Sequence, residues 1–125
     1  MSKIIYQEES FQIMGVIFEV HNNLGSGFSE IVYKDALEYE FMKLNIPYER
    51  EKEYQVQYKD TILKHKFYAD FVIFSGIILK IKSCDSLNES HIGQCINYLK
   101  VSKNKLAILI NFSKGHEIEY KRIVL

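Results

Sequence analysis

The sequence predicts an α/β fold, a mixed sheet with helices packed on it, in one domain covering residues 1–125. Its 125 residues are enough to bury a real core, and a hydrophobic content of 47% excludes a disordered chain. Helical and strand-like patterns follow one another in the order α-α-β-β-β-α-β-β. The third helix lies between two strands and provides the crossover that parallel neighbours need, so a mixed sheet is expected.

The segment Phe67–Ser83 organises this prediction, because it has the pattern of a β-hairpin. Two apolar runs rich in β-branched and aromatic residues flank a Ser-Gly pair. A three-residue loop over 74–76, with Gly76 in the left-handed conformation, is a common connection between such strands. This loop would pair Ile73 with Ile77.

The same register would bring three charged side chains together. It sets Asp70 opposite Lys80, and because side chains alternate along a strand, Lys82 would share their face. Leu79 and Ile81 would face the other way. One carboxylate and two ammonium groups on an apolar hairpin are the most chemically distinctive feature of the sequence.

The first helix is expected over about Glu8–Asn23, ending before a Gly-Ser-Gly turn. Apolar residues cover nearly every side of it, so we expect it to be largely buried. These residues are Phe11, Ile13, Met14, Val16, Ile17, Phe18 and Val20. Glu19 and His21 are then notable, because a buried charge needs a partner, a metal or a cleft. The alternative is that both lie at a solvated helix end.

The second helix should begin after Ser29 as N-cap and stop before Asn45 and Pro47. Its amphipathic stripe comprises Tyr33, Leu37, Phe41 and Leu44. Glu30 projects near the same face as Tyr33. It would either favour the helix dipole or point into a cleft from the helix N-terminus.

Strands are expected on both sides of the third helix. Tyr48–Tyr58 alternates polar and apolar residues like a half-buried strand, and Thr61–Lys66 either begins the next strand or forms a short extra one. Leu106–Ile110 is a continuous apolar run typical of a buried strand. The last strand should cover Ile118–Leu125. Its inward residues would be Ile118, Tyr120 and Val124.

A capping box of Ser86 and Glu89 predicts the start of the third helix, which should run to about Lys100. Its buried stripe would comprise Ile92, Cys95, Ile96 and Leu99. A polar stripe beside it comprises His91, Gln94 and Tyr98. Such a stripe either lines a cleft or forms a solvated flank of the helix.

Composition narrows the classes of partner. The 16 basic and 16 acidic residues balance, so any contact with nucleic acid must come from a local patch. The first ten residues lack the apolar segment of a signal peptide, and no apolar run has the ~20 residues of a membrane span. The two cysteines lack metal-ligand spacing. We therefore expect a cytoplasmic protein, and an exposed edge strand would allow a homodimer.

A series of short motifs resembles a known family. Residues 27–33, Gly-Phe-Ser-Glu-Ile-Val-Tyr, fit the pattern G-x-x-E-x-x-Y. Downstream follow Tyr-Ala-Asp at 68–70, Leu-Lys-Ile-Lys at 79–82, Gln94 with Asn-Tyr-Leu-Lys at 97–100, and Leu-Ile-Asn-Phe at 109–112. In this order they resemble the GxxExxY protein family, a branch of the PD-(D/E)xK nuclease-like superfamily. The resemblance extends from about Ile13 to Val124.

The resemblance implies a restriction-endonuclease-like core and metal-dependent hydrolysis of phosphodiester bonds, with DNA as the favoured substrate. Two carboxylates would hold Mg²⁺ or Mn²⁺, and the metal would activate the attacking water. Asp70 matches the metal-binding aspartate, Lys82 the catalytic lysine and Gln94 the helix glutamine. Glu19 or Glu30 matches the helix carboxylate. Further cleft candidates are His21, Tyr33, His91 and Tyr98.

Lys80 breaks this pattern, because it stands where the motif requires Asp or Glu. At ~4 Å and an effective dielectric near 20, a like-charge contact costs on the order of 4 kcal/mol per unit charge. Three hypotheses follow. The chain is an active nuclease whose helix glutamate replaces the missing ligand, or a nuclease-like protein that has lost catalysis, or a variant of an active chain. In the second case it would bind nucleic acid or act as a protein-interaction module.

Overall fold

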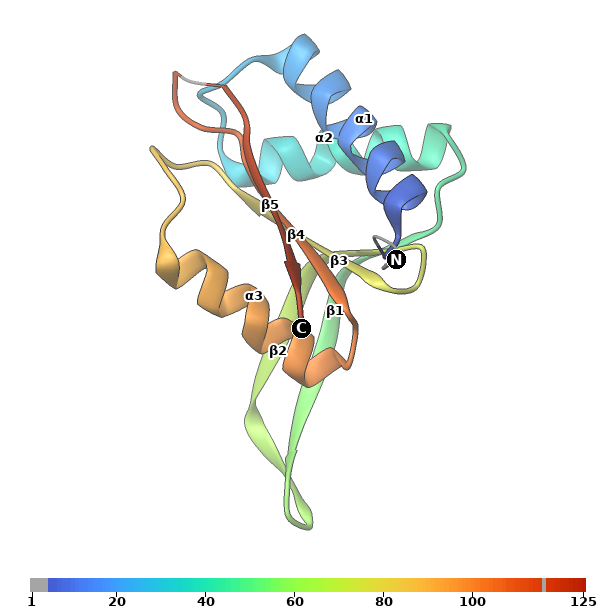
Figure 1. The fold of residues 1–125 in the computed structure, drawn as a ribbon, viewed down its shortest axis with the longest axis vertical. Helices are drawn as coiled ribbons and strands as arrows, with labels where there is room; N and C mark the ends of the chain where they lie inside the picture. The colour runs from blue at the N-terminus through green and yellow to red at the C-terminus, as the bar shows by residue number, and fades with distance from the viewer. Residues whose placement is uncertain (1–4, 116) are drawn as a thin grey trace, which may run out of the picture.

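The computed structural model describes residues 5–115 and 117–125. A five-stranded mixed sheet in the order β1-β2-β3-β4-β5 forms its centre, with β3 and β4 parallel and the other neighbours antiparallel (Figure 1). The elements are α1 (Gln7–Leu24), α2 (Glu30–Lys43), β1 (Tyr48–Tyr58), β2 (Thr61–Ile73), β3 (Ile77–Lys82), α3 (Glu89–Ser102), β4 (Leu106–Asn111) and β5 (Glu119–Val124). The predicted element order and mixed sheet are confirmed.

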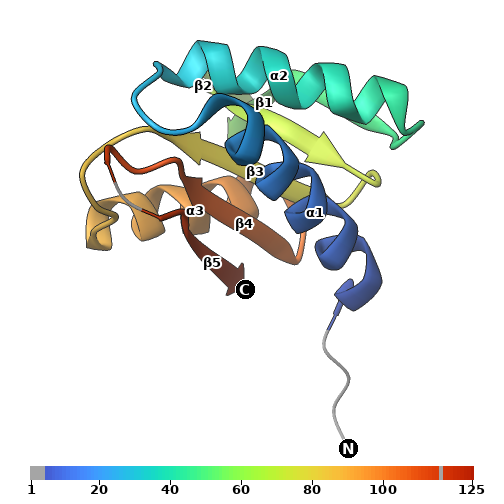
Figure 2. The ribbon, with the colours of Figure 1, turned by 90° about the horizontal axis from the view of Figure 1, so that it is seen from above.

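Helices cover both faces of the sheet, with α1 and α2 on one face and α3 on the other (Figure 2). The larger core lies under α1 and α2, where Leu79 and Ile81 belong to the same buried cluster as Tyr33 and Phe41. A smaller core under α3 contains Cys95 and Leu99. Strand β4 is buried along its whole length, as its apolar run predicts. In the described part of the chain, no helix combines the length and apolar character that a membrane crossing requires.

The hairpin between β2 and β3 has the predicted register, with Ile73 opposite Ile77. The expected left-handed glycine is wrong. Phe74 and Ser75 have φ of 54° and 60°, and the Gly76 N–H donates to the Ile73 carbonyl. A Cβ at Gly76 would lie 2.7 Å from the Tyr6 hydroxyl oxygen, so a larger residue there would require the Tyr6 side chain to shift.

Three predictions of burial on the helices and the last strand are wrong. Helix α1 buries one stripe, while Phe11 and Phe18 are 80% and 44% exposed. Leu44, placed in the stripe of α2, lies just beyond the helix and is exposed. In β5, Tyr120 and Val124 are exposed, since this edge strand is covered over only part of its surface.

The start of α3 also differs from the prediction. Asn88 is the N-cap, and its side chain accepts hydrogen bonds from the backbone of Ser90 and His91. The His91 imidazole completes the capping box by accepting from the Asn88 N–H at 3.1 Å. The box thus begins two residues after Ser86, because Asn caps a helix as well as Ser does.

Candidate functional site around Asp70

Asp70 lies where β2 and β3 separate. The paired residues run from Ile73–Ile77 to Phe71–Leu79. Beyond this pair, the Ile81 N–H of β3 donates to a side chain of β2 and not to its backbone. The acceptor is Asp70 Oδ2, at 2.7 Å. The residue is 4% exposed. The carboxylate of Asp70 is therefore buried where the two strands separate, and the hydrogen bond from Ile81 fixes its position.

Two ammonium groups contact this carboxylate. The Nζ of Lys34, from α2, lies 3.2 Å from Asp70 Oδ1, and the Nζ of Lys80, from β3, lies 3.5 Å from Asp70 Oδ2. The lysine side chains are only 13% and 15% exposed. Together with the Ile81 N–H, they engage both oxygens of Asp70 with positive or donor groups. The predicted proximity of Asp70 and Lys80 is confirmed.

Lys34 also binds a second carboxylate, from β1. Its Nζ lies 2.5 Å from Glu51 Oε1, and Glu51 has a left-handed φ of 54° inside the strand. Burial opposes the charge of Lys34, but hydrogen bonds to Glu51 and Asp70 and the attraction of both carboxylates raise its pKa above the ordinary value of 10.5. Lys34 therefore stays charged at neutral pH as an internal cation between two carboxylates.

A cleft of about 430 Å³ opens beside Lys80 on the face that carries α3. It is lined by His65, Lys66, Phe67, Tyr68, Lys80, Lys82, Gln94, Asn97 and Tyr98. The Lys80 ammonium lies 5.6 Å from the centroid of the Tyr98 ring, a cation–π contact that holds it between Asp70 and the helix. The cleft is thus lined by basic, aromatic and amide side chains. The Asp70 carboxylate does not line it but is buried next to Lys80.

Cys95 lies under this cleft in the smaller core. Burial raises the pKa of its thiol to about 11, against the opposing attraction of Lys80 and Lys82. A thiol that is neutral at physiological pH and fully buried is a poor nucleophile. Cys95 therefore acts as a core residue, in agreement with the buried stripe predicted for α3.

The two candidate helix glutamates lie in other pockets. Glu19 is exposed, accepts a hydrogen bond from Asn23 at 3.1 Å, and lines a hollow between α1 and the end of α2. Glu30 lines an open pocket at the start of α2 together with Ser83 and Lys114. The structure shows neither carboxylate in contact with Asp70.

Three other cleft candidates have structural contacts. The Tyr33 hydroxyl donates to the Gly25 carbonyl at 2.6 Å, and its ring stacks on Phe112 with centroids 4.0 Å apart. His21 packs near Phe112 at the end of α1, and His91 caps α3. Of the polar stripe on α3, Gln94 and Tyr98 reach the basic cleft.

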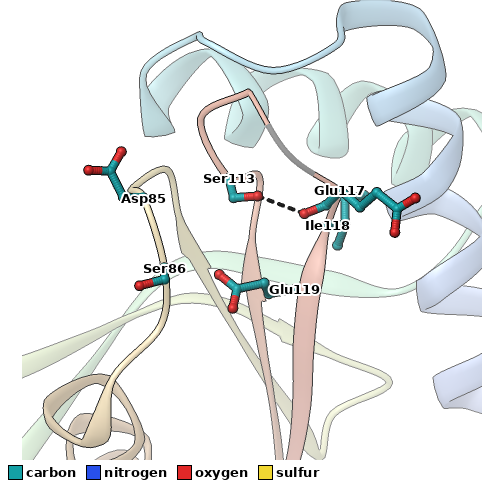
Figure 3. A pocket seen from close by; sticks show the side chains of 6 residues that line it. All are labelled: Asp85, Ser86, Ser113, Glu117, Ile118 and Glu119. Atoms are coloured by element: carbon teal, nitrogen blue, oxygen red, sulfur yellow. Dashed lines mark hydrogen bonds between the residues drawn. The ribbon is translucent and has the colours of Figure 1, made fainter.

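A pocket of about 570 Å³ lies elsewhere, between the loops that follow β3 and β4 (Figure 3). Its polar groups fix these loops. Glu119 Oε1 accepts hydrogen bonds from the Asn111 side chain and the Leu87 N–H, and the Ser113 hydroxyl donates to the Glu117 carbonyl. The buried Asn111 side chain also accepts a hydrogen bond from the Cys84 N–H and donates one to the Cys84 carbonyl. These contacts hold the connection into α3, which positions the basic cleft.

The sequence from residue 7 to 123 matches the profile of the PD-(D/E)XK nuclease superfamily. The chain belongs to this superfamily. The crystal structure of SSO0001 is similar to this PD-(D/E)XK chain, with a TM-score of 0.60 and 21% identity. The likeness covers 95% of this chain, which spans 59% of that chain's length. At this identity the likeness establishes the fold alone. No curated protein sequence matches the chain.

PD-(D/E)XK nucleases usually use Mg²⁺ or Mn²⁺, and the residues around Asp70 do not fit such an ion. Divalent cations of this kind need several oxygen ligands, but Asp70 faces two ammonium groups and a backbone N–H. Among residues 5–115 and 117–125, no three Asp, Glu, His or Cys side chains are grouped to hold a metal. In this PD-(D/E)XK chain, the Asp70 carboxylate is therefore paired with two lysines.

Proposed function

We propose that this chain is a GxxExxY-type PD-(D/E)XK domain that binds the phosphates of nucleic acid without cleaving them. One observation carries the proposal: Lys34 and Lys80 neutralise Asp70, the carboxylate that a nuclease of this superfamily would use for its metal. A divalent ion would have to displace both ammonium groups before it reached that carboxylate. The lysines take the charge role of the ion.

The basic cleft offers the groups that a phosphate diester would contact. Lys80 and Lys82 project into it, and Lys82 has no ion-pair partner within 4 Å among the described residues. The side-chain amides of Gln94 and Asn97 add hydrogen-bond donors. Tyr98 adds a ring face on which a base can stack. Lysine, amide and aromatic groups in one cleft support binding of nucleic acid.

Binding should be measured by fluorescence anisotropy with labelled 20-base-pair duplex DNA, over a series of KCl concentrations, in EDTA and in Mg²⁺. The variant Lys80→Gln/Lys82→Gln should bind about tenfold more weakly near 0.1 M salt. Its slope of log K against log salt should be shallower by about 0.9 for the loss of Lys82, which is unpaired within the described part of the chain, and by at most about 1.8, because Asp70 already compensates part of the charge of Lys80.

A double substitution away from the cleft serves as the control. Lys43→Gln/Lys121→Gln removes the same charge from exposed positions on α2 and β5 and should bind like the wild type. Equal weakening in both variants would contradict a specific role of the cleft. Cleavage of the labelled DNA in Mg²⁺ by the wild-type chain, abolished by Asp70→Asn, would contradict the non-catalytic function.

A further inference from the structure

The tip of the β1–β2 hairpin, residues 55–66, extends beyond the rest of the molecule as a two-stranded ribbon (Figure 1). We call this segment the arm. Residues 57–66 are all exposed. They include three large apolar side chains, Tyr58, Ile62 and Leu63, with exposed fractions of 55%, 56% and 40%. A hairpin without a covered face contributes little to a core, which suggests a role in binding.

The arm is basic, although the positive and negative charges of the whole chain balance. It carries Lys59, Lys64, His65 and Lys66 against one acidic residue, Asp60. Lys66 contacts Glu53 at 3.5 Å, with both side chains about 40% exposed, and a pair so exposed contributes little. The arm thus presents a local positive patch, the kind that a polyanion recognises.

The arm is continuous with the basic cleft. His65 and Lys66 line that cleft together with Lys80 and Lys82. A nucleic acid whose phosphates contact the cleft lysines would therefore pass along the arm. Two copies of the chain would bring equal positive charges together at their arms, which disfavours a homodimer through this surface.

The shape of the arm suits a DNA groove. The ladder changes register, from Gln55–Lys66 to Gln57–Ile62, so three residues of β2 lie opposite Val56. Such a bulge increases the twist of a ribbon. From Gln55 to the turn the arm spans about four residues, or about 13 Å, which exceeds the ~8.5 Å depth of the major groove.

We infer that the arm enters the major groove of duplex DNA while the cleft lysines hold the flanking phosphates. This inference rests on the proposed nucleic-acid binding and names its substrate class. The major groove of B-form DNA, about 12 Å wide, admits a two-stranded ribbon, whereas the major groove of A-form RNA is too narrow. The exposed apolar side chains would contact base edges such as thymine methyl groups.

The test compares three ligands of one sequence by fluorescence anisotropy: a 20-base-pair DNA duplex, the matching RNA duplex and single-stranded DNA. Lys59→Gln/Lys64→Gln should weaken DNA-duplex binding about tenfold near 0.1 M salt and make the salt slope shallower by about 1.8. Ile62→Ser/Leu63→Ser should weaken it with the salt slope unchanged, because no charge is removed. Binding of the RNA duplex and the single strand should weaken less than binding of the DNA duplex in each variant, because neither offers a major groove that admits the arm.

Lys43→Gln/Lys121→Gln again gives the matched loss of charge and should leave all three ligands unaffected. The arm residues are exposed, so the far-ultraviolet circular dichroism and Tm of the variants should match the wild type. Duplex binding by the arm variants equal to that of the control would overturn the inference while leaving the cleft intact. A dimer in sedimentation that Ile62→Ser/Leu63→Ser converts to monomer would also overturn it. Failure of the wild type to bind any of the ligands at 50 mM salt would overturn the proposed function itself.

Discussion

The substitution Asp70→Asn should destabilise this chain, and the contacts of Asp70 set the expected size. The amide oxygen can still accept the Ile81 N–H, so the change removes the negative charge and leaves that hydrogen bond possible. Lys34 and Lys80 would then lose their shared counter-charge at positions 13% and 15% exposed. Breaking a fully buried ion pair costs about 3–5 kcal/mol, so the partial exposure here indicates a loss of about 2–3 kcal/mol.

The loss should be measured as the free energy of unfolding in urea, with the Tm as a second readout. For a chain of this size, about 2–3 kcal/mol corresponds to a fall in Tm of roughly 10 °C. Lys34→Met should restore part of the stability of the Asp70→Asn variant, because one uncompensated ammonium group is removed, although Glu51 then loses its partner. An Asp70→Asn variant that is more stable than the wild type would refute the reasoning. A site built for a metal clusters negative charge, so neutralising one of its carboxylates stabilises the metal-free protein.

Two further predictions concern titratable groups. The folded-state pKa of Lys34 is raised, so its ion pairs stabilise the fold fully below pH 10.5 and lose that effect as the pH rises through the higher folded pKa. The difference in unfolding free energy between the wild type and Lys34→Met should therefore be constant from about pH 7 to 9.5 and shrink only above pH 10.5. A decline of this difference already below pH 9 would contradict the raised pKa of Lys34. Cys95 is buried with a pKa of about 11, so a disulfide reagent at pH 8 should modify the partly exposed Cys84 quickly and Cys95 only after urea is added. Rapid modification of two thiols in the native chain would contradict this burial.

The hairpin register and the charged pair could be predicted because strand patterning is local. Apolar runs on both sides of a short loop fix Ile73 opposite Ile77, and alternation then brings Asp70 near Lys80. The loop conformation was not predictable from glycine alone. The left-handed residues are Phe74 and Ser75, whereas Gly76 lies beside the side chain of Tyr6, which comes from a distant part of the chain.

Lys34 and Glu51 could not be predicted as site residues, because their meeting depends on how α2 packs on the sheet. One signal was available. Lys34 follows Tyr33 and lies three residues before Leu37, so it borders the buried stripe of α2. Glu51 gives no such signal, since its left-handed backbone interrupts the alternation expected of a strand. Family resemblance also favoured Glu19 and Glu30, which the structure places away from Asp70.

Titration with Mn²⁺ by isothermal calorimetry tests the central claim, that internal lysines replace the metal at Asp70. The wild-type chain should give no binding heat up to millimolar Mn²⁺, because Lys34 and Lys80 occupy the carboxylate. The variant Lys34→Met/Lys80→Glu removes both ammonium groups and adds a second carboxylate, and it should bind the ion. Stoichiometric binding of Mn²⁺ by the wild type, lost in Asp70→Asn, would contradict the claim.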